Sequence, residues 1–209
     1  MTSPTAPGWR ELTDAGEVAD ALADLFETRG DRSYSEAISQ TDHARQVGAH
    51  AMAARQTDAT VVAAFLHDIG HLLRTDPAEQ GVEVDEDRHH EVVGARFLAN
   101  WFDASVTTPI ALHVPAKRFL CAVQPSYLAT LSPASVRSLE LQGGPMTKAE
   151  VAEFERHPEA ETAVALRRWD DLGKEPGAPA PSVRTFREII AELVVTPEPA
   201  PLQLEDEVS

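Results

Sequence analysis

The segment FLHDIGHLL, residues 65–73, places two histidines four positions apart in an apolar run, with an aspartate beside the first histidine. A helix turns about 100° per residue, so His67 and His71 would share one face and Asp68 would lie next to it. A buried His–Asp pair is costly unless its charge is paired or the groups hold a metal. The segment therefore predicts either a metal site or a capped core histidine in a helical protein.

The rest of the chain also favours helices, because apolar residues recur at helical spacing and no strand alternation is present. Thr147 and Glu150 predict a capping box before one helix, and a break is expected at Pro115 within 113–120. Caps and stop residues predict further helices over 13–29 with Thr13 as cap, 39–57, 60–73, 88–102, 131–146 closed by Gly143 and Gly144, 157–172 and 183–195. The pattern predicts an all-α protein.

Length and composition indicate one domain. A chain of 209 residues with 43% hydrophobic residues can bury a single core. We expect one domain over 1–195, with a Pro/Gly-rich linker at 173–182 before the last helix. The acidic stretch 75–88 is expected to be an exposed loop, and the Pro-rich acidic tail 196–209 is expected to be disordered.

Charge and cysteine content narrow the classes of partner. With 18 Lys and Arg against 34 Asp and Glu, the formal charge of −16 disfavours binding to nucleic acid. Cys121 stands alone, which excludes an internal disulfide, and the N-terminus lacks the layout of a signal peptide. No apolar run approaches the ~20 residues of a membrane-spanning helix. We therefore expect a cytoplasmic protein that binds neither membranes nor nucleic acid.

Histidines on other predicted helices strengthen the metal interpretation. His43, His90 and His113 each lie on a separate predicted helix or helix end, and Asp170 lies near the end of another. Helical bundles assemble metal sites from one inward ligand per helix. Imidazole and carboxylate ligands suit iron, manganese, zinc or cobalt, so the residues alone leave the metal open.

Some assignments stay open from the residues alone. His89 precedes His90 and Asp171 follows Asp170, so either member of each pair could be the ligand. Without further information, Lys117 and Arg167 would be interpreted as ordinary surface cations.

The order of His43, the His67–Asp68 pair and Asp170 resembles the HD-domain superfamily of all-helical metalloproteins. Several stretches together resemble its phosphonate-degrading oxygenases, of the 2-amino-1-hydroxyethylphosphonate dioxygenase type, which are related to inositol oxygenase. These stretches are YSEAISQTDHARQ (34–46), HDIGH (67–71), HHEVVGARFL (89–98), HVPAKRFL (113–120), LSPASVRSLELQGGPM (131–146) and RRWDD (167–171). The resemblance covers nearly all of the chain before the linker, and it implies an HD-domain helical bundle with a di-metal site in its core.

This resemblance implies a mixed-valence pair of iron ions, Fe(II) and Fe(III). Asp68 would bridge the irons, His43, His67 and Asp170 would complete one coordination shell, and His90 and His113 would complete the other. The implied ligand set is His43, His67, Asp68, His90, His113 and Asp170.

The resemblance also implies the reaction, which is O2-dependent cleavage of the C–P bond of a 1-hydroxyalkylphosphonate to a carboxylate and inorganic phosphate. The implied catalytic residues are Asp68, His71 and Lys117, and the phosphonate contacts are His71, Lys117, Ser135 and Arg167. Tyr34 and Glu36 would lie over the far end of the substrate, where a carboxylate can meet an ammonium group. A 2-oxoglutarate-dependent hydroxylase would be a functional partner, because it would make the 1-hydroxy compound.

Two alternatives remain at this point. A metal-dependent HD-type phosphohydrolase would use Asp68 and a metal to activate water against a phosphate ester or nucleotide. A non-catalytic HD-like binding module would usually have lost ligands, whereas this set is complete. The sequence leaves the choice of 1-hydroxyphosphonate and the oligomeric state open.

Overall fold

The computed structural model describes residues 8–31, 38–73 and 89–195. The described residues form helices, turns and loops without a β-strand, which confirms the all-α prediction. Tyr34, Glu36, the 75–88 stretch and the 196–209 tail lie outside them. The elements are a 3₁₀ helix η1 (Trp9–Glu11) and the α-helices α1 (Ala15–Arg29), α2 (Gln40–Ala53), α3 (Asp58–Leu66), α4 (Ile69–Leu72), α5 (His90–Leu98), α6 (Ala104–Val123), α7 (Pro125–Leu128), α8 (Pro133–Leu141), α9 (Lys148–Phe154), α10 (Ala160–Leu172) and α11 (Val183–Leu193).

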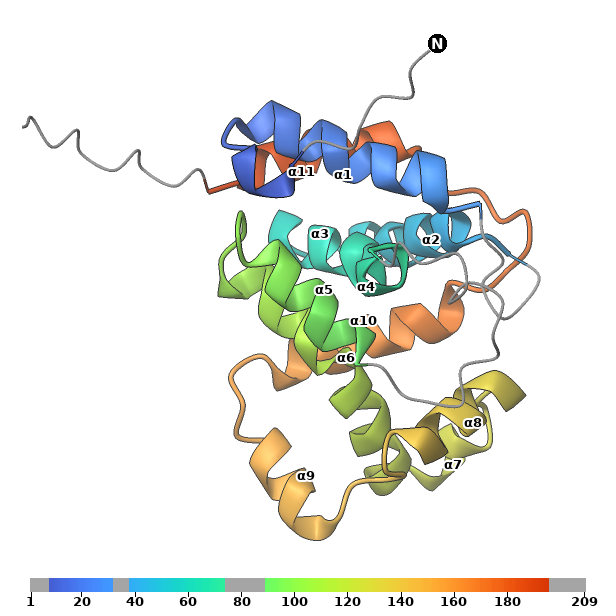
Figure 1. Ribbon diagram of the computed structural model, residues 1–209. Coiled ribbons are helices and arrows are strands. Elements are labelled where there is room, and N and C mark those ends of the chain that lie inside the picture. Colours follow the sequence, from blue (N-terminus) through green and yellow to red (C-terminus); the bar gives the residue numbers. More distant parts are fainter. Residues whose placement is uncertain (1–7, 32–37, 74–88, 196–209) are drawn as a thin grey trace, which may run out of the picture.

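The helices are arranged in layers (Figure 1). Helices α1 and α11, from the two ends of the chain, pack side by side as an outer layer. Helices α2 and α3 lie beneath them, and α3 in turn packs on α6, which is flanked by α5 and α10. Helices α7 and α9 contact α6 at the opposite end of the molecule from α1 and α11.

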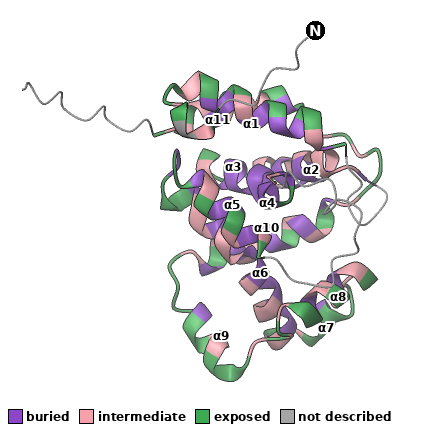
Figure 2. Cartoon of the chain, viewed as in Figure 1, coloured by how far each residue is buried: buried purple, intermediate pink, exposed green. Residues whose placement is uncertain are grey.

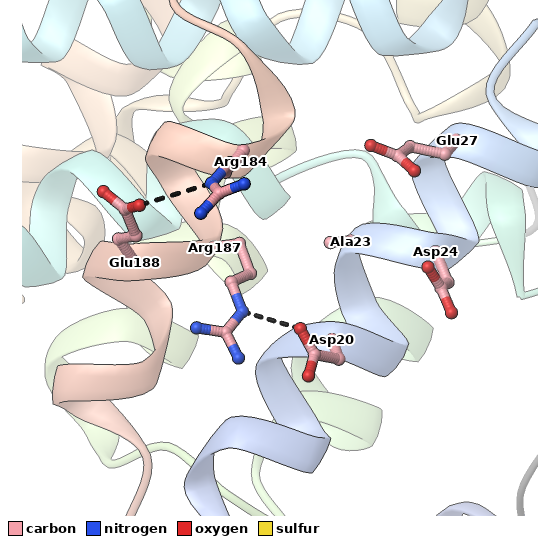
Figure 3. A pocket seen from close by; sticks show the side chains of 7 residues that line it. All are labelled: Asp20, Ala23, Asp24, Glu27, Arg184, Arg187 and Glu188. Carbon is pink, nitrogen blue, oxygen red and sulfur yellow. Dashed lines mark hydrogen bonds and ion pairs between the residues drawn. The ribbon is translucent and has the colours of Figure 1, made fainter.

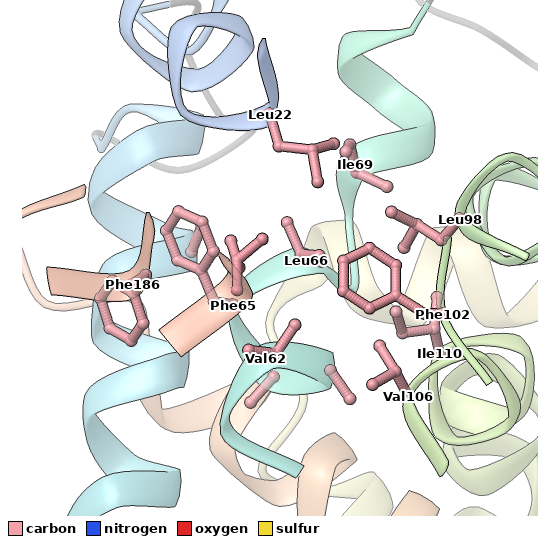
Figure 4. Close-up of a cluster of buried hydrophobic side chains, with 14 of the residues drawn as sticks. Leu22, Val62, Phe65, Leu66, Ile69, Leu98, Phe102, Val106, Ile110 and Phe186 are labelled. Carbon is pink, nitrogen blue, oxygen red and sulfur yellow. The ribbon is translucent and has the colours of Figure 1, made fainter. Parts of the chain in front are cut away.

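Helix α3 forms the centre of the core. Every residue from Thr60 to Leu66 is buried, because α2, α6, α10 and α11 all pack against this one helix. Figure 2 shows the same concentration of buried residues in the middle layer. The Phe65 ring stacks on Phe186 of α11 with 4.4 Å between centroids (Figure 4). A helix that is apolar all round is expected at such a central position.

The predicted single helix over 60–73 is wrong, because the chain forms two helices with a break between them. Helix α3 begins earlier, where the Thr57 side chain accepts the Thr60 N–H, and it ends at Leu66. Helix α4 begins at Ile69 and packs on α5. The break leaves His67 and Asp68 at the junction of two helices.

Helix α6 and the start of α1 also differ from the expectation, and α2, α5, α8 and α10 are shorter than the predicted helices 39–57, 88–102, 131–146 and 157–172. Helix α6 continues through both Pro109 and Pro115, so the predicted break at Pro115 is wrong. A proline inside a helix costs about 3 kcal/mol, and the packing of α6 on α3, α5 and α10 offsets that cost. Helix α1 is capped by Asp14, which accepts the Glu17 N–H, and Thr13 is not the cap.

Other sequence signals are confirmed. Thr147 and Glu150 form the predicted capping box of α9. Helix α8 is followed by Gly143 and Gly144, whose φ angles of 91° and 72° are left-handed. Such angles favour glycine over residues with a Cβ.

The predicted linker 173–182 is tied to α2. Arg45 donates to the carbonyl oxygens of Ala180 at 2.8 Å and Pro181 at 2.7 Å. Gln46 donates to the carbonyl of Glu175 at 2.8 Å. These bonds hold the segment between α10 and α11 against the start of α2, where His43 lies.

A charged hollow of about 440 Å³ lies between α1 and α11 (Figure 3). Arg187 Nε pairs with Asp20 at 2.7 Å across the two helices. Exposed ion pairs of this kind contribute little to stability, so the buried apolar contact between α1 and α11 holds the layer together. The hollow contains none of the predicted site residues.

Candidate metal and substrate site

The structure brings together six predicted ligands from five separate parts of the fold. Helix α2 supplies His43, the junction of α3 and α4 supplies His67 and Asp68, α5 supplies His90, α6 supplies His113 and α10 supplies Asp170. All are buried except His90, whose side chain is 16% exposed. These positions span most of the described chain, so the site depends on the whole fold.

One group of ligand atoms surrounds the Oδ2 oxygen of Asp68. His43 Nε2 and His67 Nε2 lie 3.6 and 3.4 Å from Oδ2 and 3.3 Å from each other. Asp170 Oδ1 lies 3.4 Å from His43 Nε2. The three residues His43, His67 and Asp68 are close enough together to hold a metal ion.

A second group surrounds the other carboxylate oxygen of Asp68. His90 Nε2 and His113 Nε2 lie 3.3 and 3.8 Å from Oδ1 and 3.2 Å from each other. Asp68, His90 and His113 form a second group that could hold a metal ion. Asp68 therefore presents one oxygen to each group, as a carboxylate shared by two cations would.

Backbone carbonyls orient three of the imidazoles. The Nδ1 atoms of His43, His67 and His113 lie 2.7, 2.9 and 2.8 Å from the carbonyl oxygens of Gly173, Ala64 and Ile110, respectively. A proton on Nδ1 that is donated to a carbonyl leaves Nε2 as the acceptor or metal ligand. The three rings thus present lone pairs to the centre of the cluster.

The ligand atoms fit metal ions better than they fit one another. Asp170 Oδ1 is buried and has no hydrogen-bond partner in the described chain. The Nε2 atoms of His43 and His67 lie 3.3 Å apart and those of His90 and His113 lie 3.2 Å apart. A cation between the rings of each pair would explain these short distances best. The donors are imidazoles and carboxylates, and Cys121 is not among them, so the site suits iron, manganese, zinc or cobalt.

For four of the six ligands, the electrostatics favour the protonation state that binds metals; at His43, burial opposes the charge but Asp170 and Asp68 outweigh it and raise the pKa of the imidazole. Burial lowers the pKa of His67 and, with the neighbouring histidines, holds that of His113 well below its ordinary value. Burial opposes the charge on Asp170, but Arg167 outweighs it and the pKa of this carboxyl lies well below its usual range. Surrounding histidines have the same effect on the pKa of Asp68. Neutral imidazoles and ionised carboxylates are the forms that bind metal ions.

His71 does not join either ligand group. The helix break moves it off the face of His67, and its ring stacks on that of His90 with 4.1 Å between centroids. Unlike most of the ligands, His71 is exposed. It therefore lies at the outer edge of the cluster beside the second group.

The two ambiguous pairs are distinguished by geometry. His89 has a left-handed φ of 49° and a side chain that is 70% exposed, whereas His90 faces Asp68. Asp170 faces His43, whereas both oxygens of Asp171 contact Tyr127 or Arg167. The structure thus brings His90 and Asp170 into the cluster.

Lys117 and Arg167 are buried, so their interpretation as surface cations is wrong. Lys117 follows His113 by one turn of α6, and Arg167 precedes Asp170 by one turn of α10. The Lys117 ammonium donates to Ser138 Oγ at 2.8 Å, and this hydroxyl donates to the Ser135 carbonyl at 3.1 Å. Both cations therefore sit one helical turn from a predicted metal ligand.

Sequence reasoning missed Lys174, which lies just beyond α10. Its ammonium is 3.4 Å from Ser135 Oγ and 3.8 Å from Asp170 Oδ1. Lys174 follows Asp170 by four residues, and this helical spacing could have indicated its role, but residue 174 falls in the segment that was predicted to be a linker. Lys174 adds a third cation beside Lys117 and Arg167.

Comparisons with known proteins agree with this arrangement. The family model of the HD domain matches residues 41–120. A hydroxymethylphosphonate dioxygenase of Gimesia maris is 47% identical over 171 residues, which cover 82% of this chain and 85% of the relative. A [1-hydroxy-2-(trimethylamino)ethyl]phosphonate dioxygenase (glycine-betaine-forming) of Leisingera caerulea is 37% identical over 180 residues, which cover 86% of this chain and 91% of the relative.

None of the helices in the described part of the chain is both long and apolar enough to span a membrane.

The alignments with the two relatives cover most of this chain and most of each relative. The matched HD segment contains five of the six predicted ligands. A buried cluster of histidines and aspartates lies where a metal cofactor would bind. The chain therefore belongs to the HD-domain phosphonate dioxygenases, a family of oxygenases with a metal cofactor.

Proposed function

We propose that this enzyme uses O2 to cleave the C–P bond of a 1-hydroxyalkylphosphonate, yielding a carboxylate and inorganic phosphate. The observation that carries the proposal is Asp68, whose two oxygens face separate pairs of histidines. The reaction breaks the C–P bond and one C–H bond and consumes one O2 per phosphate. Both oxygen atoms of O2 end in the products.

We infer that the metals are two iron ions, Fe(II) and Fe(III), which would bind O2 and activate it toward the substrate. Asp68 would contribute one carboxylate oxygen to each ion. One ion would be held further by His43, His67 and Asp170, and the other by His90 and His113. The imidazole and carboxylate donors and the oxygenase relatives support this choice.

The chain itself would bind and orient the phosphonate. A dianion needs a local basic pocket in a protein with a formal charge of −16. Lys117 and Arg167 supply buried cations one turn from predicted metal ligands, and Ser135 is a buried hydroxyl. Low solvent access strengthens such charge-assisted hydrogen bonds. We propose that these three residues hold the phosphonate beside the metals.

The two ends of the substrate would meet different groups. His71, stacked on His90 at the exposed edge, would contact the phosphonate. By the family resemblance, Tyr34 and Glu36, which lie outside the described residues, would contact the far group of the substrate, where a carboxylate can pair with an ammonium group. We therefore propose 2-amino-1-hydroxyethylphosphonate or a close analogue as the substrate, supplied by a 2-oxoglutarate-dependent hydroxylase.

The test is aerobic incubation of iron-loaded protein with three substrates that share the 1-hydroxyphosphonate group. Hydroxymethylphosphonate, 2-amino-1-hydroxyethylphosphonate and its trimethylammonium analogue differ in the far group. We expect phosphate release and O2 uptake in a 1:1 ratio with at least one of them, and no phosphate release without O2.

A phosphohydrolase would behave differently, because hydrolysis consumes no O2. Release of phosphate from p-nitrophenyl phosphate at equal rates with and without O2, and no turnover of the phosphonates, would overturn the proposal. The ranking of the three substrates would separately test the assignment of the far group.

A further inference from the structure

Arg167 is held by a closed set of partners from two helices. Its Nε donates to the Tyr127 hydroxyl of α7 at 3.0 Å. Its two terminal nitrogens donate to Asp170 Oδ2 and to Asp171 Oδ1. The Arg167 side chain is 5% exposed, so these contacts lie out of bulk water.

The Tyr127 hydroxyl also bonds to Asp171, another partner of Arg167. It accepts from Arg167 and donates to Asp171 Oδ2, so both Asp171 oxygens are occupied. Burial raises the pKa of Tyr127, which keeps this hydroxyl protonated and able to donate. Arg167, Tyr127 and Asp171 thus form a triangle in which each member bonds to the other two.

The triangle fixes the guanidinium without using all of its donors. A guanidinium has five N–H groups, and Arg167 uses one on each nitrogen in the bonds described. One N–H on each terminal nitrogen is left to meet an anion. Lys174, 3.9 Å from Asp171 Oδ1 and 3.4 Å from Ser135 Oγ, connects the triangle to the serine of the substrate pocket.

Asp171 places a negative charge near the pocket that is proposed to bind a dianion, and this charge needs an explanation. An uncompensated carboxylate near the phosphonate would repel it. Here the Asp171 charge is paired with Arg167 and hydrogen-bonded by Tyr127. The Asp171 carboxylate therefore serves to orient the Arg167 guanidinium.

We propose that Tyr127 and Asp171 are positioning residues that hold the Arg167 guanidinium with two N–H groups directed at the substrate phosphonate. The same guanidinium restrains Asp170, so the triangle connects the phosphonate pocket to the predicted metal ligands. This inference rests on the proposed function, because it takes the phosphonate as the anion that Arg167 meets.

The test compares the binding of methylphosphonate, which has no 1-hydroxy group to oxidise, to iron-loaded wild type, Tyr127→Phe and Asp171→Asn by calorimetry. A hydrogen bond to a charged group corresponds to about 10–100-fold in affinity, and partial loss of orientation should raise Kd about tenfold in each variant. We expect KM for the turned-over hydroxyphosphonate to rise by a similar factor, with iron content and melting temperature near wild type. Arg168→Gln is the matched control, because Arg168 pairs with Gln124 in an exposed position on the same helix.

A second set of variants tests whether Tyr127 positions Arg167 or only links α7 to α10. In Arg167→Lys the planar fork is gone, so adding Tyr127→Phe should change the Kd for methylphosphonate less than twofold. Wild-type Kd in both single variants, or an undiminished effect of Tyr127→Phe on the lysine background, would overturn the inference. Failure of wild type to turn over any hydroxyphosphonate would overturn the proposed function and this inference with it, whereas turnover without binding of methylphosphonate would overturn this inference alone.

Discussion

Replacement of Gly70 by alanine should disrupt the second ligand group while sparing the first. A Cβ at this position would lie 2.1 Å from the carbonyl oxygen of His90 and 2.8 Å from its carbonyl carbon. The obstruction is backbone, so no side-chain rotation can relieve it. An ordinary contact begins at 3.4 Å, and α4 and α5 would have to separate by about 1.3 Å along this line.

The size of this displacement can be compared with what a metal site tolerates. Metal–ligand distances vary by only about 0.2 Å, and His90 Nε2 lies 3.3 Å from Asp68 Oδ1 in the undisturbed site. A shift of the first residue of α5 should therefore remove His90 from coordination. Overpacking costs about 1–3 kcal/mol, and for a chain of this size a melting temperature lower by roughly 3–10 °C is expected.

The assay is metal content by elemental analysis after iron loading, together with thermal unfolding. We expect Gly70→Ala to retain about half of the wild-type iron and to lose turnover. Gly48→Ala is the control, because its Cβ would lie 2.5 Å from the Phe186 ring in the apolar core. This variant should lose stability but keep its iron. Wild-type iron content and melting temperature in Gly70→Ala would refute the reasoning.

Three further predictions address other contacts. Asp68→Ala should abolish turnover because the shared carboxylate is lost, and activity with a full iron complement would contradict its role. Glu91 is buried with Oε2 3.6 Å from His90 Nδ1, so Glu91→Gln should weaken metal binding about 10–100-fold; unchanged affinity in a chelator titration would count against it. Bonds from the Thr147 backbone and Arg118 lower the pKa of Glu150 from 4.5 to about 2, so its contribution to stability is present above pH 4.5 and lost as pH falls toward 2. The gap in urea midpoint between wild type and Glu150→Gln should shrink over that range, and a constant gap would exclude this explanation.

The sequence was informative at several positions where a local rule decides the structure, although Thr13 was wrongly predicted as the cap of α1. The capping box at Thr147 and Glu150 and the glycines after α8 were predictable because they act within a few residues. His43, His90, His113 and Asp170 could be proposed as candidates because they lie on separate predicted helices, whereas the complete set of six ligands came from the family resemblance. The helical fold followed from the same local periodicity.

Features that depend on distant contacts were not predictable in this way. Pro115 predicts a break by its local geometry, but α6 continues because helices that include α3, α5 and α10 pack on it. From the sequence, Lys117 and Arg167 are interpreted as surface cations, because their burial depends on partners from other helices, Ser138 for Lys117 and Tyr127 for Arg167. Tyr127 carried no signal at all, since its partners lie 40 and 44 residues away.

The break between α3 and α4 explains why one aspartate can serve two groups of ligands. On a continuous helix, His67 and His71 would point to one side and Asp68 would lie beside them at an angle fixed by the helix. The break releases Asp68 from that constraint and lets α4 turn onto α5, where Gly70 permits close contact with His90. His67 then stays with His43, His90 approaches the opposite oxygen of Asp68, and His71 moves to the edge. The shared carboxylate is thus a consequence of the helix break together with the missing side chain at position 70, and neither feature alone would produce it.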